Sequence, residues 1–358
     1  MSAGSAKDQA QSPPAGLSSE QVDRLTQFLR AEGLIGQDAL ALKPLTGGQS
    51  NPTFLMTSGA SRYVLRKKPP GPLLPSAHAV DREYRVMKAL QDTTVPVPQM
   101  FLYSDDASIV GTPFYVMAFL EGRVFMDQSL PGMSQAERGQ IYTEMNRVIA
   151  DLHLVKPDAV GLETFGKAGN YFARQIGRWS KQYLESHADD IPAMRNLIDW
   201  LPQHIPEGDL TSVVHGDYRL DNLVFHPTDA RVIGVLDWEL STLGHPLADF
   251  SYHCMSWHIP ATLWRGIGGL DLAALGIPSE PEYVDRYAHQ TGLRAQEHWD
   301  FYLAYNLFRM AAILDGIARR ALDGNAAAAD AVETGKKARP LAEIGWHYAK
   351  CYQSHFRA

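Results

Sequence analysis

The segment from Val213 to Asp237 constrains the fold and the chemistry of this chain more than any other part of its sequence. An apolar stretch leads into a polar loop that contains Asp217 and Asn222, and a second apolar stretch follows. Residues 227–230 have the composition of a turn, and a third apolar stretch then ends in Asp237. Two short apolar stretches joined by a turn predict a β-hairpin, with polar groups gathered at its open end.

With the turn centred between Asp229 and Ala230, Asn222 and Asp237 face each other across this hairpin. Cross-strand partners lie about 4.5–5.5 Å apart, and a bulge would shift the register by one residue while keeping the two as neighbours. An amide oxygen beside a carboxylate suits Mg²⁺, which binds one or two carboxylates together with phosphates and water. Asp217, just before them, can accept the proton of an attacking hydroxyl. The spacing therefore predicts Asp217 as the catalytic residue and Asn222 and Asp237 as metal ligands.

This order of residues resembles the protein-kinase active site, in which a catalytic Asp, a metal-binding Asn and a second metal-binding Asp follow one another. The first motif here reads His215-Gly216-Asp217 and the second reads Asp237-Trp238-Glu239. Both departures from the protein-kinase motifs resemble the aminoglycoside phosphotransferase and choline kinase-like family. The resemblance implies an α+β, bilobal, protein-kinase-like fold, with a small antiparallel-sheet N-lobe and a larger, mainly helical C-lobe. It also implies ATP and Mg²⁺ as cofactors, and structural support of the catalytic loop by His215 and Asp249.

Strand and helix patterns divide the sequence into three parts. Residues 1–16, rich in Ala, Ser, Gln and Pro, are expected to form a disordered tail. Residues 17–119 are expected to form an N-terminal nucleotide-binding lobe, in which strands precede a helix from Ser76 to about Gln91. Residues 120–358 are expected to form a C-terminal catalytic and substrate lobe. Helices are predicted there over 170–188, 281–322 and 339–353, and capping boxes are predicted at Ser18 with Gln21 and at Ser134 with Glu137.

A loop of small residues lies between two predicted strands of the N-terminal lobe. In it, Gly47, Gly48, Ser50 and Asn51 offer backbone N–H groups that can cradle phosphates. The order Gly-Gly-x-Ser-Asn resembles the phosphate-binding loop of the phosphotransferases, although a Gly-Gly pair is more often an ordinary turn.

The strand after this loop carries Arg66 where a protein kinase carries its phosphate-binding Lys. Lys68 lies on the same face of the strand, so either cation can grip the phosphates. Glu83 lies on the apolar stripe of the predicted helix, where a carboxylate needs a partner, and Arg66 is the candidate. The alternative is that Glu83 lies at the edge of the stripe and reaches solvent. The resemblance also implies that Ala118 and Leu120 hydrogen-bond adenine through main-chain groups.

The composition excludes several classes of partner. The chain has 33 basic and 40 acidic residues, a net charge of −7, so neither nucleic acid nor an anionic membrane is expected as a partner. No apolar run reaches the roughly 18 residues that a membrane helix needs. The N-terminus lacks the apolar centre of a signal peptide, and Cys254 and Cys351 are expected to be free thiols. These features predict a cytoplasmic protein.

The phosphate acceptor is predicted to be a small molecule that carries a hydroxyl group. Arg174, Arg178 and Arg309 lie on predicted helices and can grip an anionic substrate such as a CoA ester, although a solvated basic face explains them equally well. Leu65–Gly71 and Leu236–Glu239 resemble the kinase-like domains fused to some acyl-CoA dehydrogenases. Those domains are associated with phosphorylating hydroxyacyl-CoA compounds. The resemblance therefore implies transfer of the γ-phosphoryl group to such a hydroxyl, and a separate acyl-CoA dehydrogenase in the same pathway.

Three other functions stay open at the level of the sequence: an aminoglycoside-type antibiotic kinase, a catalytically silent nucleotide-binding module, and an enzyme that transfers AMP. The intact Asp217, Asn222 and Asp237 argue against the silent module, because inactive members usually lose one of them. An aminoglycoside pocket is typically strongly acidic, and the arginines point weakly the other way. The mass of the product separates transfer of AMP from transfer of a phosphoryl group.

Overall fold

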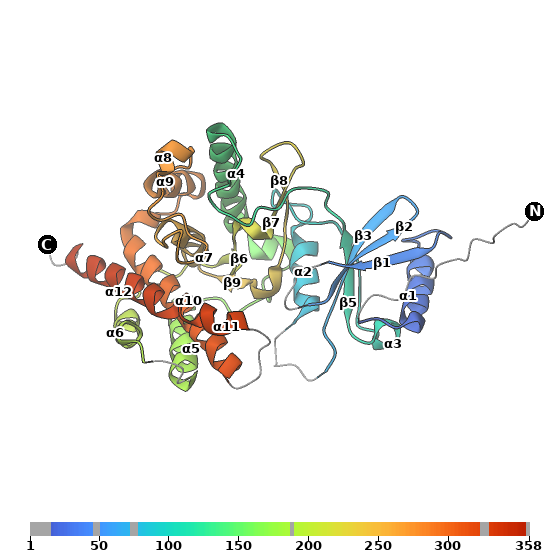
Figure 1. Cartoon of the computed structure of the whole chain (residues 1–358), viewed down its shortest axis with the longest axis horizontal. Coiled ribbons are helices and arrows are strands. Elements are labelled where there is room, and N and C mark those ends of the chain that lie inside the picture. Colours follow the sequence, from blue (N-terminus) through green and yellow to red (C-terminus); the bar gives the residue numbers. More distant parts are fainter. Residues whose placement is uncertain (1–15, 46–50, 72–77, 187–189, 323–328, 356–358) are drawn as a thin grey trace, which may run out of the picture. The chain divides into compact units, whose positions relative to one another are not determined.

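The computed structural model describes residues 16–45, 51–71, 78–186, 190–322 and 329–355 (Figure 1). The chain divides into two compact units. Residues 1–91 and 97–121 belong to the N-terminal unit, and residues 92–96 and 122–358 belong to the C-terminal unit. Within the described ranges, no helix is both long enough and apolar enough to cross a membrane. The cytoplasmic location stays a prediction.

A five-stranded antiparallel sheet forms the centre of the N-terminal unit, with its strands in the order β1-β2-β3-β5-β4. In the hairpin of β2 and β3, Gly59 has a φ of +56°, and a Cβ atom there would lie 2.3 Å from Asp38 Oδ2. This turn therefore requires glycine. The elements of the unit are α1 (Ser19–Ala31), β1 (Leu40–Pro44), β2 (Thr53–Ser58), β3 (Ser61–Lys67), α2 (Val80–Leu90), β4 (Met100–Ser104), α3 (Ala107–Val110) and β5 (Phe114–Ala118).

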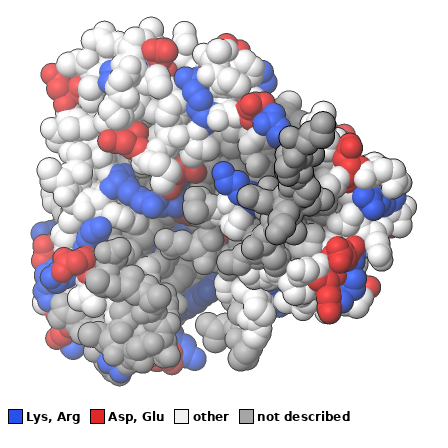
Figure 2. All heavy atoms as spheres, turned by 45° about the vertical axis from the view of Figure 1, so that its right-hand side comes forward, with Lys and Arg blue, Asp and Glu red and all other residues white. Residues whose placement is uncertain are grey.

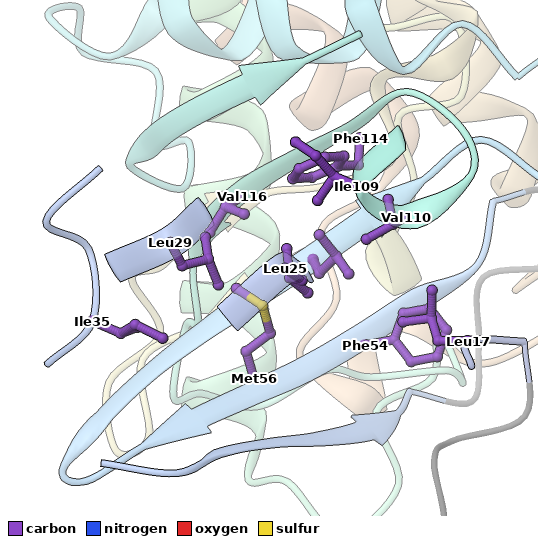
Figure 3. Packing of buried hydrophobic residues seen from close by; sticks show 11 residues of the cluster. Leu17, Leu25, Leu29, Ile35, Phe54, Met56, Ile109, Val110, Phe114 and Val116 are labelled. Atoms are coloured by element: carbon purple, nitrogen blue, oxygen red, sulfur yellow. The ribbon is translucent and has the colours of Figure 1, made fainter. Parts of the chain in front are cut away.

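Helices α1 and α3 pack together on one face of this sheet (Figure 1). Alternate residues of a strand point to opposite faces, so Phe54 and Met56 of β2 both reach the buried cluster on this side. Leu25 and Leu29 of α1 lie in the same cluster and are fully buried. Figure 3 shows these side chains gathered between the helix and the strands. The small lobe thus has its own apolar core.

Helix α2 packs against β4 and β5 and carries Glu83 on its buried side. Leu65 of β3 belongs to the cluster beneath α1, so the next residue, Arg66, points to the other face of the strand. The predicted start of α2 at Ser76 lies outside the described residues. His78, however, has a φ of 60°, and the helix begins only at Val80, later than predicted.

The C-terminal unit is mainly helical, and its long helix α10 contacts α5, α6, α7, α11 and α12. Two short antiparallel sheets, β6 with β9 and β7 with β8, lie among the helices (Figure 1). The helices are α4 (Gln135–Leu154), α5 (Tyr171–Ser186), α6 (Pro192–Trp200), α7 (Pro246–Cys254), α8 (Leu272–Leu275), α9 (Glu280–Thr291), α10 (Trp299–Leu322), α11 (Ala329–Gly335) and α12 (Ala338–His355). The strands are β6 (Ser212–Val214), β7 (Leu223–Phe225), β8 (Val232–Val235) and β9 (Thr242–Gly244).

The helical pattern predicted over 281–322 corresponds to two helices, α9 and α10. Gly292, with a φ of +72°, caps the C-terminus of α9, and α10 begins only at Trp299. A left-handed glycine at this position is a common end of a helix, and the apolar spacing alone did not reveal it.

The predicted α+β fold, with an antiparallel sheet followed by a mainly helical region, is confirmed. Both predicted capping boxes are also present, at the starts of α1 and α4. On the face drawn in Figure 2, the Lys and Arg side chains are interspersed with Asp and Glu side chains.

Candidate active site

The hairpin of β7 and β8 brings Asn222 and Asp237 to the same end, with a register one residue away from the simplest prediction. Leu223 pairs with Val235, and an irregularity at Val224 and Phe225 shifts the pairing along the strands. The backbone N–H of Leu236 donates to the carbonyl oxygen of Asn222 at 2.8 Å. Leu236, and not Asp237, is therefore the residue opposite Asn222. The shift of one residue is the effect that a bulge produces, and it keeps the two residues at the same end of the hairpin.

Asp237 leaves the strand in an unusual backbone conformation, with a φ of 65° and a ψ of 57°. Few residues other than glycine adopt this left-handed region, and such strain is concentrated at functional sites. The short 3-10 helix Trp238–Leu240 follows at once, and the indole N–H of Trp238 donates to the carbonyl of Val235 at 2.9 Å. Trp238 is fully buried, so it anchors the turn that carries Asp237.

Asp217 is held by contacts to three side chains. The hydroxyl of Tyr252 donates to Oδ1 of Asp217, and Nε of Arg219 lies 3.0 Å from the same oxygen. Nδ2 of Asn222 donates to the Asp217 carbonyl at 2.8 Å and to Oδ2 at 3.2 Å. Because Asn222 uses its N–H₂ group to fasten the loop, its Oδ1 is the atom that can bind a cation.

The loop before Asp217 is fastened by Asp249 of α7, which is buried. Its two carboxylate oxygens accept the backbone N–H groups of His215 at 2.7 Å and Gly216 at 2.8 Å. The Nε2 atom of His153 lies 3.2 Å from the same carboxylate. Burial acts to raise the pKa of Asp249, but the hydrogen bonds from His153 and from the loop outweigh it and lower the pKa. The hydrogen bonds that the resemblance implied for Asp249 are therefore present.

The structure explains why histidine occupies position 215 and glycine occupies position 216. Nε2 of His215 lies 2.9 Å from the carbonyl oxygen of Leu236, so this nitrogen carries the proton and Nδ1 accepts the Asp217 N–H at 3.2 Å. Gly216 has a φ of +83°, and a Cβ atom there would lie 2.7 Å from the carbonyl oxygen of Leu240. This explains why glycine stands where protein kinases usually have arginine.

In the N-terminal unit, Arg66 and Glu83 form the predicted pair, with Nε of Arg66 lying 2.9 Å from Oε2 of Glu83. The side chain of Glu83 is 1% exposed, so the alternative in which it reaches solvent is wrong. Tyr115 donates to Oε2 at 2.8 Å, and Asn51 donates to Oε1 at 2.7 Å. Nδ1 of His78 lies 3.1 Å from the side-chain oxygen of Asn51, so the carboxylate lies in a buried polar network.

Lys67 and Lys68 have different surroundings from Arg66. Lys67 points to the other face of β3, where it is buried and donates to the carbonyl of Val110 at 2.6 Å. Burial lowers the pKa of Lys67. Lys68 lies just beyond the end of β3. Of the three neighbouring cations, Arg66 is the one held by Glu83.

The other predicted nucleotide residues are only partly described. Gly47, Gly48 and Ser50 lie outside the described residues. The backbone N–H of Ala118 donates to the carbonyl of Gln99 at 2.8 Å, so this N–H is not available to an adenine. Leu120 follows β5 and is half-buried.

A model of the phosphotransferase enzyme family matches residues 41–305 of this chain. The chain belongs to the phosphotransferase enzyme family. The predicted family and the predicted class of enzyme are thereby confirmed.

This phosphotransferase is 46% identical over 332 residues to acyl-CoA dehydrogenase family member 10 of Mus musculus. The match covers 91% of this chain but only 31% of the relative, so the chain spans about a third of that protein. A crystal structure from Ralstonia eutropha, provisionally named as an aminoglycoside phosphotransferase, is 55% identical with a TM-score of 0.85. That match covers 92% of this chain and 98% of the other.

A thermostable mutant of an aminoglycoside phosphotransferase, solved with AMP-PNP and hygromycin B, gives a TM-score of 0.60 at 14% identity. The match covers 90% of this chain and 97% of that one. At this identity the likeness shows the fold alone, and it confirms the kinase-like fold.

The three arginines predicted to contact substrate lie in different surroundings in this phosphotransferase. Arg309 is 7% exposed and donates to the carbonyl of Gly216 at 2.9 Å, so it holds the loop that carries Asp217. The Arg178 side chain lies over the ring of Trp179, at 5.0 Å from its centre, and is exposed. Arg174 donates to the carbonyl of Lys167 at 2.6 Å. Burial of Arg309 follows from its place on α10, which lies among five other helices.

Two residues of the site were missed by the sequence analysis, namely Tyr252 and Arg219. Tyr252 lies three residues after Asp249 on α7 and so shares its helix face, which is a signal that spacing can give. Arg219 lies two residues after Asp217 and is close to the carboxylates of Asp217, Asp221 and Asp237, which raise its pKa against the opposing effect of burial. Arg219 offsets this cluster of negative charge together with Arg265, whose Nη1 lies 2.6 Å from Oδ2 of Asp221.

Proposed function

We propose that this phosphotransferase moves the γ-phosphoryl group of ATP to the hydroxyl group of a hydroxyacyl compound, such as a hydroxyacyl-CoA. The single observation that carries the proposal is the arrangement at the end of the β7–β8 hairpin. There Asp217 is fixed by Tyr252 and Arg219, beside Asn222 and Asp237.

The donor set fits Mg²⁺. The N–H₂ group of Asn222 donates to the Asp217 carbonyl, so the side-chain oxygen of Asn222 is the atom that can bind a metal ion. Asp237 has a left-handed backbone conformation where the chain leaves its strand. An amide oxygen and a carboxylate are hard oxygen ligands of the kind that Mg²⁺ uses together with phosphates. Mg²⁺ bound by these two residues would neutralise part of the phosphate charge. In the N-terminal unit, Arg66, oriented by Glu83, would bind the phosphates.

Asp217 would act on the acceptor. Oδ1 accepts from Tyr252 and contacts Arg219, whereas Oδ2 accepts one hydrogen bond, from Nδ2 of Asn222 at 3.2 Å, so Oδ2 is the oxygen with room to meet the acceptor hydroxyl. As the hydroxyl oxygen forms its bond to the γ-phosphorus, its proton passes to Oδ2. The bond from the γ-phosphorus to the β–γ bridging oxygen breaks, and ADP leaves with that electron pair.

Two observations support a hydroxyacyl acceptor. The relative that is 46% identical is named an acyl-CoA dehydrogenase family member. This chain matches about a third of the length of that relative. Two arginines lie near Asp217: Arg219 contacts its carboxylate, and Arg309 donates to the carbonyl of Gly216. We propose that a separate acyl-CoA dehydrogenase acts on the same acyl group in the pathway of this enzyme.

An aminoglycoside kinase is the second candidate, and the provisional name of the 55%-identical protein favours it. The experiment that separates the two is a mass-spectrometric assay with Mg-ATP and two panels of acceptors. Hydroxyacyl-CoA esters form one panel and aminoglycosides form the other. A phosphorylated CoA ester supports the proposal, whereas phosphorylation of aminoglycosides alone would replace it by the second candidate.

A further inference from the structure

The hairpin of β7 and β8, with Asn222 and Asp237 at its open end, is too short to hold its own position. Strand β7 has three residues and β8 has four, and their pairing shifts at Val224 and Phe225. An isolated two-stranded hairpin is at best marginally stable in water. The placement of Asn222 and Asp237 therefore depends on what supports the hairpin from outside.

Both edges of the hairpin are bound by segments that join the two compact units. The chain first enters the C-terminal unit over residues 92–96 and returns to it at Gly122. On the edge of β8, the backbone N–H of Val235 donates to the carbonyl of Pro96 at 2.8 Å. On the edge of β7, Arg123 and Phe225 exchange two backbone hydrogen bonds of 2.8 Å each, as paired residues of an antiparallel sheet do. The hairpin thus lies between the two connections.

The side chain of Arg123 binds the turn of the same hairpin. Its Nε donates to the carbonyl of His226 at 3.0 Å, and its Nη2 donates to the carbonyl of Asp229 at 2.7 Å. The planar guanidinium offers these donors in a fixed fork, which a lysine does not reproduce. The guanidinium also lies 5.3 Å from the ring centre of Phe125, and that ring lies 5.4 Å from the ring of the buried Phe225. Arg123 therefore holds the hairpin both at its edge and at its turn.

Gly122, the residue before Arg123, lies directly against β7. A Cβ atom there would lie 2.3 Å from the carbonyl oxygen of Phe225 and 2.6 Å from Cγ1 of Val224. Because the nearer of these atoms belongs to the backbone, either the connection or the strand would have to shift. Only a residue without a side chain lets the connection approach the strand this closely.

We propose that Arg123 is a positioning residue of this phosphotransferase, and that it sets the affinity of Asn222 and Asp237 for a divalent metal ion by fixing the hairpin that joins them. The inference rests on the proposed function, because it takes these two residues as the metal ligands. Arg123 acts through Phe225, three residues after Asn222, and through the turn. Mg²⁺ demands near-ideal geometry, so a hairpin that is free to shift binds it more weakly.

The test measures metal binding itself on the full chain, with Mn²⁺ as the probe in the presence of AMP-PNP, by electron paramagnetic resonance. Arg123→Ala is expected to raise the dissociation constant of Mn²⁺ about three- to tenfold, the equivalent of about one net hydrogen bond. Arg123→Lys keeps the charge without the fork, so it is expected to recover only part of the parent affinity.

Arg138→Ala is the matched control. Arg138 is also half-buried and also donates to main-chain carbonyls, but those of Ser129, Leu130 and Leu275, outside the hairpin. This variant is expected to lose stability as R123A does, while its Mn²⁺ affinity stays at the parent value. Chemical denaturation of both variants supplies the comparison.

Gly122→Ala disturbs the same edge of β7 without removing a charge, and it is expected to weaken Mn²⁺ binding in the same direction as R123A. Gly36→Ala is its control, because no atom lies within 4 Å of a Cβ added at Gly36. If R123A does not fold, the comparison of R123K and G122A with the parent decides the proposal.

Parent-like Mn²⁺ affinity in R123A and G122A would overturn the proposal, because Arg123 would then support the fold alone. Equal weakening in R123A and R138A would also overturn it, since lost stability would explain both. Asp237→Ala separates these results from a failure of the proposed function. Unchanged Mn²⁺ binding in D237A would show that the assigned ligands are wrong, whereas weaker binding in D237A with none in R123A or G122A would leave the proposed function in place.

Discussion

The hydroxyl of Tyr252 on α7 donates a hydrogen bond to Oδ1 of Asp217 on the loop between β6 and β7. Burial raises the pKa of Tyr252, so the tyrosine stays protonated and remains a donor. The guanidinium of Arg309 lies 5.2 Å from the centre of the same ring. Tyr252 therefore engages Oδ1 of Asp217, which under the proposed function turns Oδ2 toward the acceptor, and Arg309 contacts both the ring and the loop.

Replacing Tyr252 by Phe tests this relationship, because the ring that Arg309 contacts is kept and only the hydroxyl is removed. A hydrogen bond to a charged group contributes about 1.5–3 kcal/mol, so kcat is expected to fall roughly ten- to hundredfold. The KM for ATP is expected to stay near the parent value. Tyr348→Phe removes a hydroxyl that contacts His258, outside the site, and serves as the control. Equal kcat values for Y252F and the parent would contradict this role.

Gly216 offers a test of the loop itself. Its φ of +83° and the 2.7 Å approach of a Cβ atom to the Leu240 carbonyl predict that Gly216→Ala lowers stability and displaces Asp217. The expected loss is about 1–3 kcal/mol, with a fall in kcat. Gly208→Ala is the matched control, because Gly208 has a φ of +95° with no atom within 4 Å of the added Cβ. Chemical denaturation and steady-state kinetics check both, and a G208A variant as impaired in kcat as G216A would contradict the account.

The sequence alone predicted what depends on local spacing, and this includes the capping boxes of Ser18 and Ser134. It also placed Asn222 and Asp237 together, because a hairpin brings its two ends together whatever its exact register. The exact pairing of β7 with β8 could not be predicted from the sequence, because the irregularity near Val224 depends on how the strand packs. Contacts between segments far apart in the chain could not be predicted either. The burial of Arg309, for example, depends on the five helices that pack against α10, and their arrangement cannot be read from local sequence patterns.

Glu83→Gln tests the buried pair of the N-terminal unit. It removes the charge that compensates Arg66, and breaking a buried pair in this way costs about 3–5 kcal/mol. The affinity for Mg-ATP is expected to fall as well, because Arg66 loses its orientation. Glu121→Gln is the control: its partner Arg62 lies at 2.5 Å, but both side chains are largely exposed, and such pairs contribute at most about 1 kcal/mol. Similar losses of unfolding free energy in the two variants would contradict this description.

The pH dependence of stability follows from His253. Burial lowers its pKa from 6.5 to about 4. Between these values the unfolded chain binds a proton at this residue and the folded chain does not, so stability falls as the pH drops through this window. The contribution is about 1.4 kcal/mol per pH unit. Urea denaturation from pH 7 to 4 is expected to give a flatter dependence for His253→Gln than for the parent, and the exposed His289→Gln is expected to keep the parent slope. An unchanged slope in H253Q would contradict the assignment.

The measurement that tests the central claim most directly is the mass of the product formed from a metabolite extract with Mg-ATP, in parallel with Mg-ATP binding. Parent protein and Asp217→Asn are compared, with Asp237→Asn beside them. The account predicts a species heavier by one phosphoryl group with the parent and its loss, by roughly 10²–10⁴ in rate, with D217N. D217N is expected to keep its affinity for Mg-ATP, whereas D237N is expected to lose much of it. A product carrying AMP, full transfer by D217N, or no binding of Mg-ATP by the parent would contradict the account.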